Sequence, residues 1–130
     1  MKNLLLILTL LFTSVFLSSP SYAGWTKMSE DVRGNTSYVD FERIRKVDGF
    51  IYYWYLSNYL KPTKYGDLSA KTYNQGDCKL FRFKSLSASY HTQPMGDGTP
   101  SESGAVKNLE WDYPPPNSVW EAILKSVCNR

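Results

Sequence analysis

The sequence predicts an α+β fold, in which an antiparallel β-sheet meander packs against a C-terminal α-helix and one disulfide joins them. Two runs rich in aromatic and β-branched residues, 50–60 and 78–90, are typical of long strands. The end of the chain repeats apolar residues at helical spacing. The only two cysteines, Cys78 and Cys128, lie in the second run and in this helix.

The first half of the predicted sheet ends in a long aromatic strand. Residues 25–31 favour a short strand, and residues 36–41 alternate as a strand does after a turn at Gly34. Asp48–Gly49 is a strong hairpin signal before the strand 50–60. We expect one face of that strand to be core and the other to be partly covered or to form a binding surface. The expected core face holds Phe50, Tyr52, Trp54, Leu56 and Leu60, and the other face holds Ile51, Tyr53, Tyr55 and Tyr59.

The second half of the predicted sheet has a turn and a bulge. Residues 68–73 favour a strand, residues 74–77 a turn, and Cys78 opens the second long strand. The apolar positions of that strand change phase, which predicts a bulge near Lys84–Ser85. Residues 93–104 are rich in Gly, Pro, Ser and Asp and predict a mobile loop.

The C-terminal helix has a clear start signal. Ser118 and Glu121 have the spacing of a capping box. The apolar stripe that follows consists of Val119, Trp120, Ile123, Leu124, Val127 and Cys128. A bond between Cys78 and Cys128 would therefore tie the helix to the sheet.

The first 23 residues predict a cleavable secretory signal peptide. A positive start precedes a 14-residue apolar run, 4–17, and a short stretch of small residues that ends at Ala23. A bilayer span needs roughly 20 apolar residues, so cleavage is favoured over a membrane anchor. We therefore expect a mature domain of residues 24–130 in the periplasm, or secreted to the cell surface. It has no further transmembrane segment and no cysteine after the apolar run for a lipid anchor.

Export bears on whether the two cysteines are oxidised. An even number of cysteines in an exported chain predicts a disulfide, here between Cys78 and Cys128, although two buried free thiols are the alternative. Loss of Lys2 with the leader lowers the net charge from +3 to +2. Such a mild charge indicates no nucleic-acid partner.

The candidates for catalysis are few, and we expect no enzyme. His91 is the only histidine, and oxidised cysteines leave no thiolate, so no metal site is expected. Serine, histidine and aspartate residues are available for a catalytic triad, but the sequence has no Gly-x-Ser-x-Gly nucleophile elbow. We therefore interpret His91 as a solvated residue. Asp40 and Glu42 share one side of a strand, but a solvated strand end accounts for them. The absence of a phosphate-binding glycine loop indicates no cofactor.

Basic residues gather between positions 61 and 84. This window contains six basic residues and only two acidic ones, Asp67 and Asp77, and aromatic residues lie between them. Such a surface binds acidic polymers or acidic protein segments, whereas ordinary strands with solvated lysines are the alternative. The candidate ligand-binding residues are Lys64, Tyr65, Lys71, Arg82 and Lys84.

From Trp25 to Cys128 the chain resembles the surface-adhesin protein E-like family of Gram-negative bacteria. The shared features are short, and their order and the cysteine placement make them specific. They are Tyr38–Val39–Asp40, Ile44, the aromatic strand, Pro62–Thr63–Lys64–Tyr65, Ser69, Lys71, Tyr73, Cys78, Arg82 and Cys128.

The resemblance implies a protein-binding function. It implies a helix tethered to the sheet by the disulfide, dimerisation, and host matrix or plasma partners such as vitronectin, laminin and plasminogen. The binding segment corresponds to residues 63–86, where this chain has the single base Lys64 in place of a basic pair. We therefore expect an exported envelope binding domain, and the alternative is a periplasmic structural or assembly protein without adhesin activity.

Overall fold

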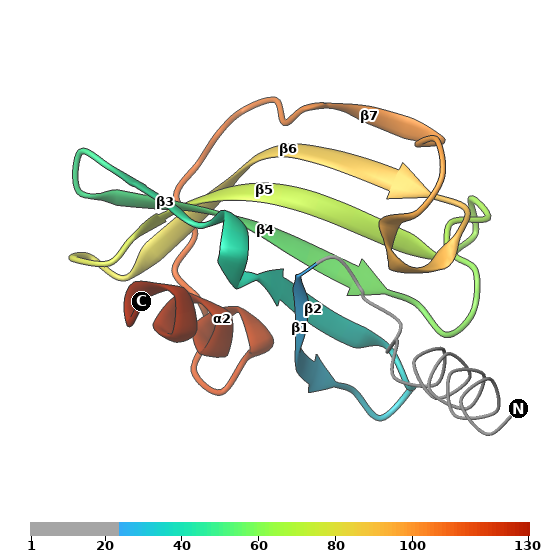
Figure 1. Cartoon of the computed structure of the whole chain (residues 1–130), viewed down its shortest axis with the longest axis horizontal. Coiled ribbons are helices and arrows are strands. Elements are labelled where there is room, and N and C mark those ends of the chain that lie inside the picture. The colour runs from blue at the N-terminus through green and yellow to red at the C-terminus, as the bar shows by residue number, and fades with distance from the viewer. Residues whose placement is uncertain (1–23) are drawn as a thin grey trace, which may run out of the picture.

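The computed structural model describes residues 24–130, and the predicted signal peptide, 1–23, lies outside the described residues. These residues form one antiparallel sheet of seven strands and a C-terminal helix, α2 (Figure 1). The strands are β1 (Trp25–Glu30), β2 (Thr36–Asp40), β3 (Arg45–Val47), β4 (Phe50–Asn58), β5 (Ser69–Asp77), β6 (Arg82–His91) and β7 (Glu102–Ala105). The helical segments are η1 (Phe41–Arg43), η2 (Pro94–Gly96) and α2 (Val119–Cys128).

The sheet is a meander, as predicted. Its order is β1-β2-β4-β5-β6-β7, and β3 pairs with the first part of β4, while β2 pairs with the second part. The 3-10 turn η1 separates β2 from β3. Because strands outnumber helices so strongly, the fold is mostly β, and the label α+β describes it only approximately.

The predicted hairpin at Asp48–Gly49 is confirmed. Both residues have positive φ, 52° and 83°, as the two central residues of a type I′ turn do. The predicted bulge is also confirmed. Tyr73 pairs with Ser87 and Asn74 pairs with Ser85, so Leu86 is the extra residue in β6.

The predicted turn at residues 74–77 is wrong, because β5 continues to Asp77. Cys78 does not open the next strand either, since it lies in the β5–β6 turn and β6 begins at Arg82. Gly76 suggested a turn, but it serves close packing. A Cβ atom at this position would lie 2.8 Å from Ile51 Cγ2 and 3.0 Å from Leu124 Cδ1.

The predicted mobile loop at residues 93–104 contains regular structure. It begins with η2 and ends in the edge strand β7. The segment folds back over the sheet, where the backbone N–H of Gly96 donates to Ser69 Oγ at 2.8 Å and Ser69 donates to the carbonyl of Gln93 at 2.6 Å. These bonds hold the segment in place, which its composition does not reveal.

The prediction of the core face of β4 is wrong for most of the strand. Ile51, Tyr53 and Tyr55 are buried and pack against α2, and of the predicted core residues only Leu56 is buried. Tyr52 and Trp54 are half-buried on the opposite face. Both faces of β4 carry aromatic residues, so alternation alone does not say which face the helix covers.

The helix α2 is placed by its cap and its apolar stripe. Ser118 Oγ accepts from the backbone N–H of Glu121 at 3.2 Å, as the capping box predicts. Trp120 lies between two rings of the sheet, with centroid distances of 4.7 Å to Tyr55 and 5.0 Å to Phe83. The fully buried residues of the helix are Ile123, Leu124 and Val127.

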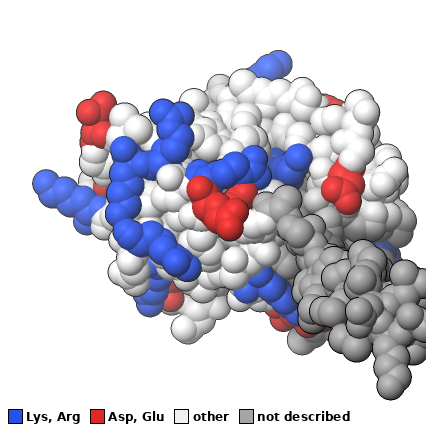
Figure 2. All heavy atoms as spheres, in the orientation of Figure 1, with Lys and Arg blue, Asp and Glu red and all other residues white. Residues whose placement is uncertain are grey.

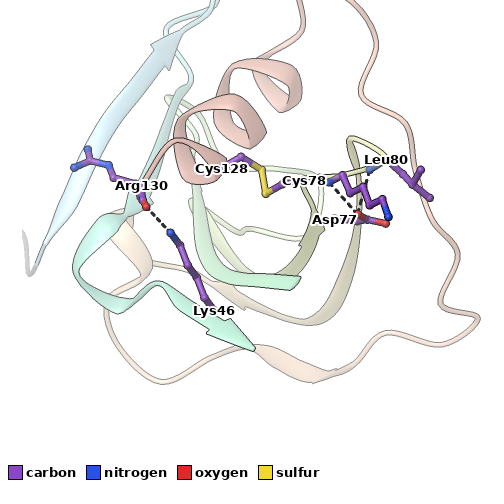
Figure 3. The surroundings of a disulfide bond; sticks show 7 residues. Lys46, Asp77, Cys78, Leu80, Cys128 and Arg130 are labelled. Carbon is purple, nitrogen blue, oxygen red and sulfur yellow. Dashed lines mark hydrogen bonds between the residues drawn. A yellow bond between two sulfur atoms is a disulfide. The ribbon is translucent and has the colours of Figure 1, made fainter. Parts of the chain in front are cut away.

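The predicted disulfide is present. Cys78 and Cys128 are joined across 50 residues, with their Cα atoms 5.7 Å apart (Figure 3). Closing a loop of this length stabilises a fold by roughly 4 kcal/mol in the chain-entropy model. Beside the bond, Lys46 donates to the carbonyl oxygen of Arg130, which holds the end of the chain to β3.

The packing of Gly76 makes a specific prediction. Gly76→Ala should lower the free energy of unfolding by about 1–3 kcal/mol, because the new methyl group overpacks the contact between Ile51 and Leu124. Urea unfolding followed by tryptophan fluorescence measures this. The matched control is Gly104→Ala in β7, where the new Cβ meets nothing within 4 Å and stability should be unchanged or slightly higher. Equal stability of the two variants would contradict close packing at Gly76.

Candidate binding surface

The face of the sheet opposite α2, called the outer face below, carries a group of aromatic side chains. Trp54 and Tyr73 lie opposite each other on β4 and β5, with ring centroids 4.8 Å apart, and Tyr52 lies 6.1 Å from Tyr73. Trp111, from the segment after β7, stacks on Phe50 at 5.8 Å. These rings are half-buried, so the outer face presents apolar surface to solvent.

Basic side chains lie over these rings. The guanidinium carbon of Arg82 and the ammonium nitrogen of Lys84 lie 4.3 Å and 4.4 Å from the ring centre of Trp111. Arg43 lies 5.8 Å from the ring centre of Trp54. All three distances are within the range of cation–π attraction. Figure 2 shows Lys and Arg side chains gathered on this view over the end of the sheet where Figure 1 places β3.

Some of these cations are paired and others are free. Arg82 bonds the nearly buried Asp77 at 2.9 Å, and Arg43 bonds the buried Asp40. Lys84, and Arg45 opposite Tyr52, have no carboxylate partner among residues 24–130. The outer face thus offers two uncompensated positive charges beside exposed aromatic surface.

The candidate residues from the sequence do not form one patch. Arg82 and Lys84 lie together on Trp111, and Lys71 lies on the same face but beside Gly96 of η2. From Lys71 to the end of β5 the strand extends about 20 Å. Lys64 and Tyr65 are in the β4–β5 loop, where the ammonium of Lys64 lies 5.0 Å from the Tyr65 ring centre.

Sequence reasoning missed three residues of the outer face: Trp111, Arg43 and Arg45. Trp111 reaches β6 because its neighbour Asp112 exchanges two backbone hydrogen bonds with Phe83, at 2.9 Å and 2.7 Å. No local pattern around Trp111 indicates this pairing. The hairpin at Asp48–Gly49 fixes the register between β3 and β4. Counting outward from this turn could therefore have placed Arg45 opposite Tyr52 from the sequence alone.

His91 is not the solvated residue that the sequence predicts, because it is 1% exposed. The segment after β6 folds over it, so that Nδ1 donates to the carbonyl of Gly98 at 3.3 Å and Nε2 accepts from Ser89 Oγ at 2.9 Å. Both ring nitrogens therefore have hydrogen-bond partners, which makes His91 part of the packing beneath η2.

Asp40 is also not a solvated carboxylate, because it is 1% exposed and caps η1 through the N–H of Glu42. Glu42 itself is exposed. Two strands, β4 and β5, lie between Asp40 on β2 and His91 at the end of β6, so these candidates share no cleft. Within residues 24–130, no group of three or more His, Cys, Asp or Glu side chains is placed to hold a metal ion.

Asp77, the ion-pair partner of Arg82, has a perturbed electrostatic environment. Burial opposes its ionisation, but the N–H groups of Leu80 and Lys79 and the guanidinium of Arg82 outweigh burial. Together they lower the pKa of Asp77 below its ordinary value. The ionised carboxylate thereby fixes both the β5–β6 turn and the position of Arg82 on Trp111.

These features define a class: a small antiparallel β-domain with a disulfide-held helix on one face and an aromatic and basic surface on the other. The chain belongs to the surface-adhesin protein E family, whose model matches residues 25–129. Within the described residues 24–130, the longest helix falls well short of the length and apolar character that crossing a bilayer requires. No curated protein sequence matches the chain.

Solved structures of protein E from Haemophilus influenzae share the fold. Crystal form II has a TM-score of 0.61 and 15% identity, and the match covers 86% of this chain and 92% of that chain. Protein E from non-typeable Haemophilus influenzae has a TM-score of 0.59 and 14% identity, and the match covers 86% of this chain and 80% of that one. At this identity the likeness shows the fold alone.

The environment of Asp77 predicts a pH dependence. Its pKa is lower in the folded state, so its stabilising contribution is present above the unfolded value of about 3.9 and is lost as the pH falls through the folded value. Asp77→Asn should therefore lower stability at neutral pH and flatten the acid limb of the stability curve, measured by urea unfolding across pH. Asp97→Asn, at an exposed carboxylate, is the control and should leave the curve unchanged. Identical acid limbs for the two variants would refute this role of Asp77.

Proposed function

We propose that this chain is an exported, non-enzymatic binding domain of the bacterial cell envelope, and that its outer face contacts an acidic segment of a partner protein. The observation that carries the proposal is the stacking of Arg82 and Lys84 on the half-buried ring of Trp111. Tryptophan and arginine are enriched among residues that dominate protein interfaces. Here their side chains are held in place before any partner arrives, which lowers the entropic cost of binding.

Membership of the surface-adhesin protein E family supports host matrix or plasma proteins, such as vitronectin, as partners. Of the five residues predicted from the sequence, Arg82 and Lys84 lie at the centre of the proposed contact. Lys71 extends the same face. Lys64 and Tyr65 lie at the other end of the strands, outside this contact.

The proposed contact surface predicts the effect of charge reversal. The double variant Arg45→Glu/Lys84→Glu should weaken binding of the mature domain to immobilised vitronectin and laminin by about tenfold, because both cations lack a partner in the fold. Surface plasmon resonance at low and high salt measures this, and the remaining binding should depend less on salt.

The matched control is Lys61→Glu/Lys64→Glu, which changes the net charge equally at two exposed positions of the β4–β5 loop, outside the proposed contact. It should retain most of the binding. If both double variants lose binding equally, the outer face is not the contact. If the unmodified domain binds neither protein, the assignment to matrix and plasma partners fails.

Export predicts a defined mature product. After signal-peptide removal the protein should begin at Gly24, which the intact mass of protein from the periplasm and from the cell surface will show. Leu10→Arg interrupts the apolar run and should leave an uncleaved precursor in the cytoplasm, whereas Val32→Arg, at a fully exposed position, should be processed normally. An unprocessed product from the unmodified chain would contradict the assignment.

A further inference from the structure

A second concave surface lies on the α2 side of the sheet, beyond the end of the helix. Figure 1 shows α2 against one end of the sheet, while the other ends of β4, β5 and β6 extend past it. Two hollows of about 680 Å³ and 470 Å³ occur here, and both include Tyr59 in their walls. Together they are called the tyrosine groove below. Their volumes are typical of small-ligand sites.

Three tyrosines line the larger hollow. Tyr59 follows β4, Tyr65 lies in the β4–β5 loop, and Tyr90 lies in β6 opposite Ala70. Tyr65 is 77% exposed and Tyr90 is 40% exposed, so both side chains are accessible to a ligand, although Lys64 lies over one face of the Tyr65 ring. A tyrosine ring offers an apolar face and a hydroxyl that donates and accepts hydrogen bonds.

The wall beside these rings is held in place by the fold. The Asp67 backbone N–H donates to Thr63 Oγ1 at 3.2 Å, and Ser101 Oγ donates to Asp67 Oδ1 at 2.7 Å. These bonds tie the β4–β5 loop to the segment before β7. The other carboxylate oxygen of Asp67 has no hydrogen-bond partner among the residues that the structure describes, so it can accept a bond from a ligand.

The groove has more carboxylates than cations in its walls. Glu102 and Lys64 line the larger hollow, and neither forms an ion pair within residues 24–130. Asp67 also lines this hollow, and Glu30 and Asp31 line the smaller one, so the groove has four carboxylates and one cation. This excess of negative charge disfavours acidic ligands. The smaller hollow continues it with hydroxyl and amide groups from Ser29, Thr36, Ser37, Ser57, Asn58 and Asn117.

This chemistry fits a sugar. The C–H groups on one face of a pyranose ring stack on an aromatic ring, while its hydroxyls bond to carboxylate, amide and hydroxyl groups. Exposed tyrosine faces beside the fixed carboxylate of Asp67 supply both parts, and the smaller hollow gives room for a second sugar unit. We propose that the tyrosine groove binds a neutral oligosaccharide, independently of the protein contact on the outer face.

The first test applies the mature domain to an array of neutral and sialylated oligosaccharides, followed by calorimetric titration of the strongest neutral ligand. Tyr65→Ala and Tyr90→Ala should each weaken its binding by about tenfold, because each removes a stacking surface. Tyr65→Phe should bind within about twofold of the unmodified domain, because the ring is retained. Tyr113→Ala, at a tyrosine that is 64% exposed outside the groove, should bind normally.

Several outcomes would overturn the proposal: an array without bound neutral glycans, a preference for sialylated ones, or equal losses from Tyr65→Ala and Tyr113→Ala. Circular dichroism checks that each variant is folded. The double variant Arg45→Glu/Lys84→Glu should keep its glycan binding, since both residues lie on the other face of the sheet. Loss of glycan binding in that variant would place the sugar on the outer face instead.

Discussion

The attachment of α2 to one face of the sheet is the constraint on which the rest of the molecule depends. Trp120 enters between Tyr55 and Phe83, and the bond from Cys128 to Cys78 fixes the last turn of the helix. A ten-residue helix covers only part of a seven-stranded sheet. The covered part becomes the core, and the uncovered surfaces, one behind the sheet and one beyond the helix, remain open for ligands.

Local signals in the sequence predicted local structure well. The Asp48–Gly49 turn, the Ser118 cap and the bulge in β6 each depend on a few neighbouring residues, and all three are confirmed. The errors concern contacts between distant segments. Gly76 is small because α2 approaches it, and His91 is buried because a later loop covers it. Neither cause can be read from the residues directly adjacent in sequence.

The aromatic and basic outer face was predicted only in part for the same reason. The basic window from 61 to 84 is continuous in sequence, but a loop, two long strands and a turn spread it across the sheet. Arg82 and Lys84 stayed together because they share one face of β6. Their aromatic partner Trp111 comes from a segment 27 residues beyond Lys84, which only the pairing of Asp112 with Phe83 brings near. A window of the sequence shows where charged residues are frequent, whereas strand pairing in the sheet determines which of them lie close together.

Under the proposed export, the covalent bond between the helix and the β5–β6 turn has a consequence for the chain before it leaves the cytoplasm. In a reducing cytoplasm the two thiols remain free, and a domain of this size then loses a contribution comparable to the net stability of many small proteins. A newly made chain would stay loose enough to be threaded through a translocation channel. Oxidation on the far side would then form the disulfide that fixes α2 to the sheet.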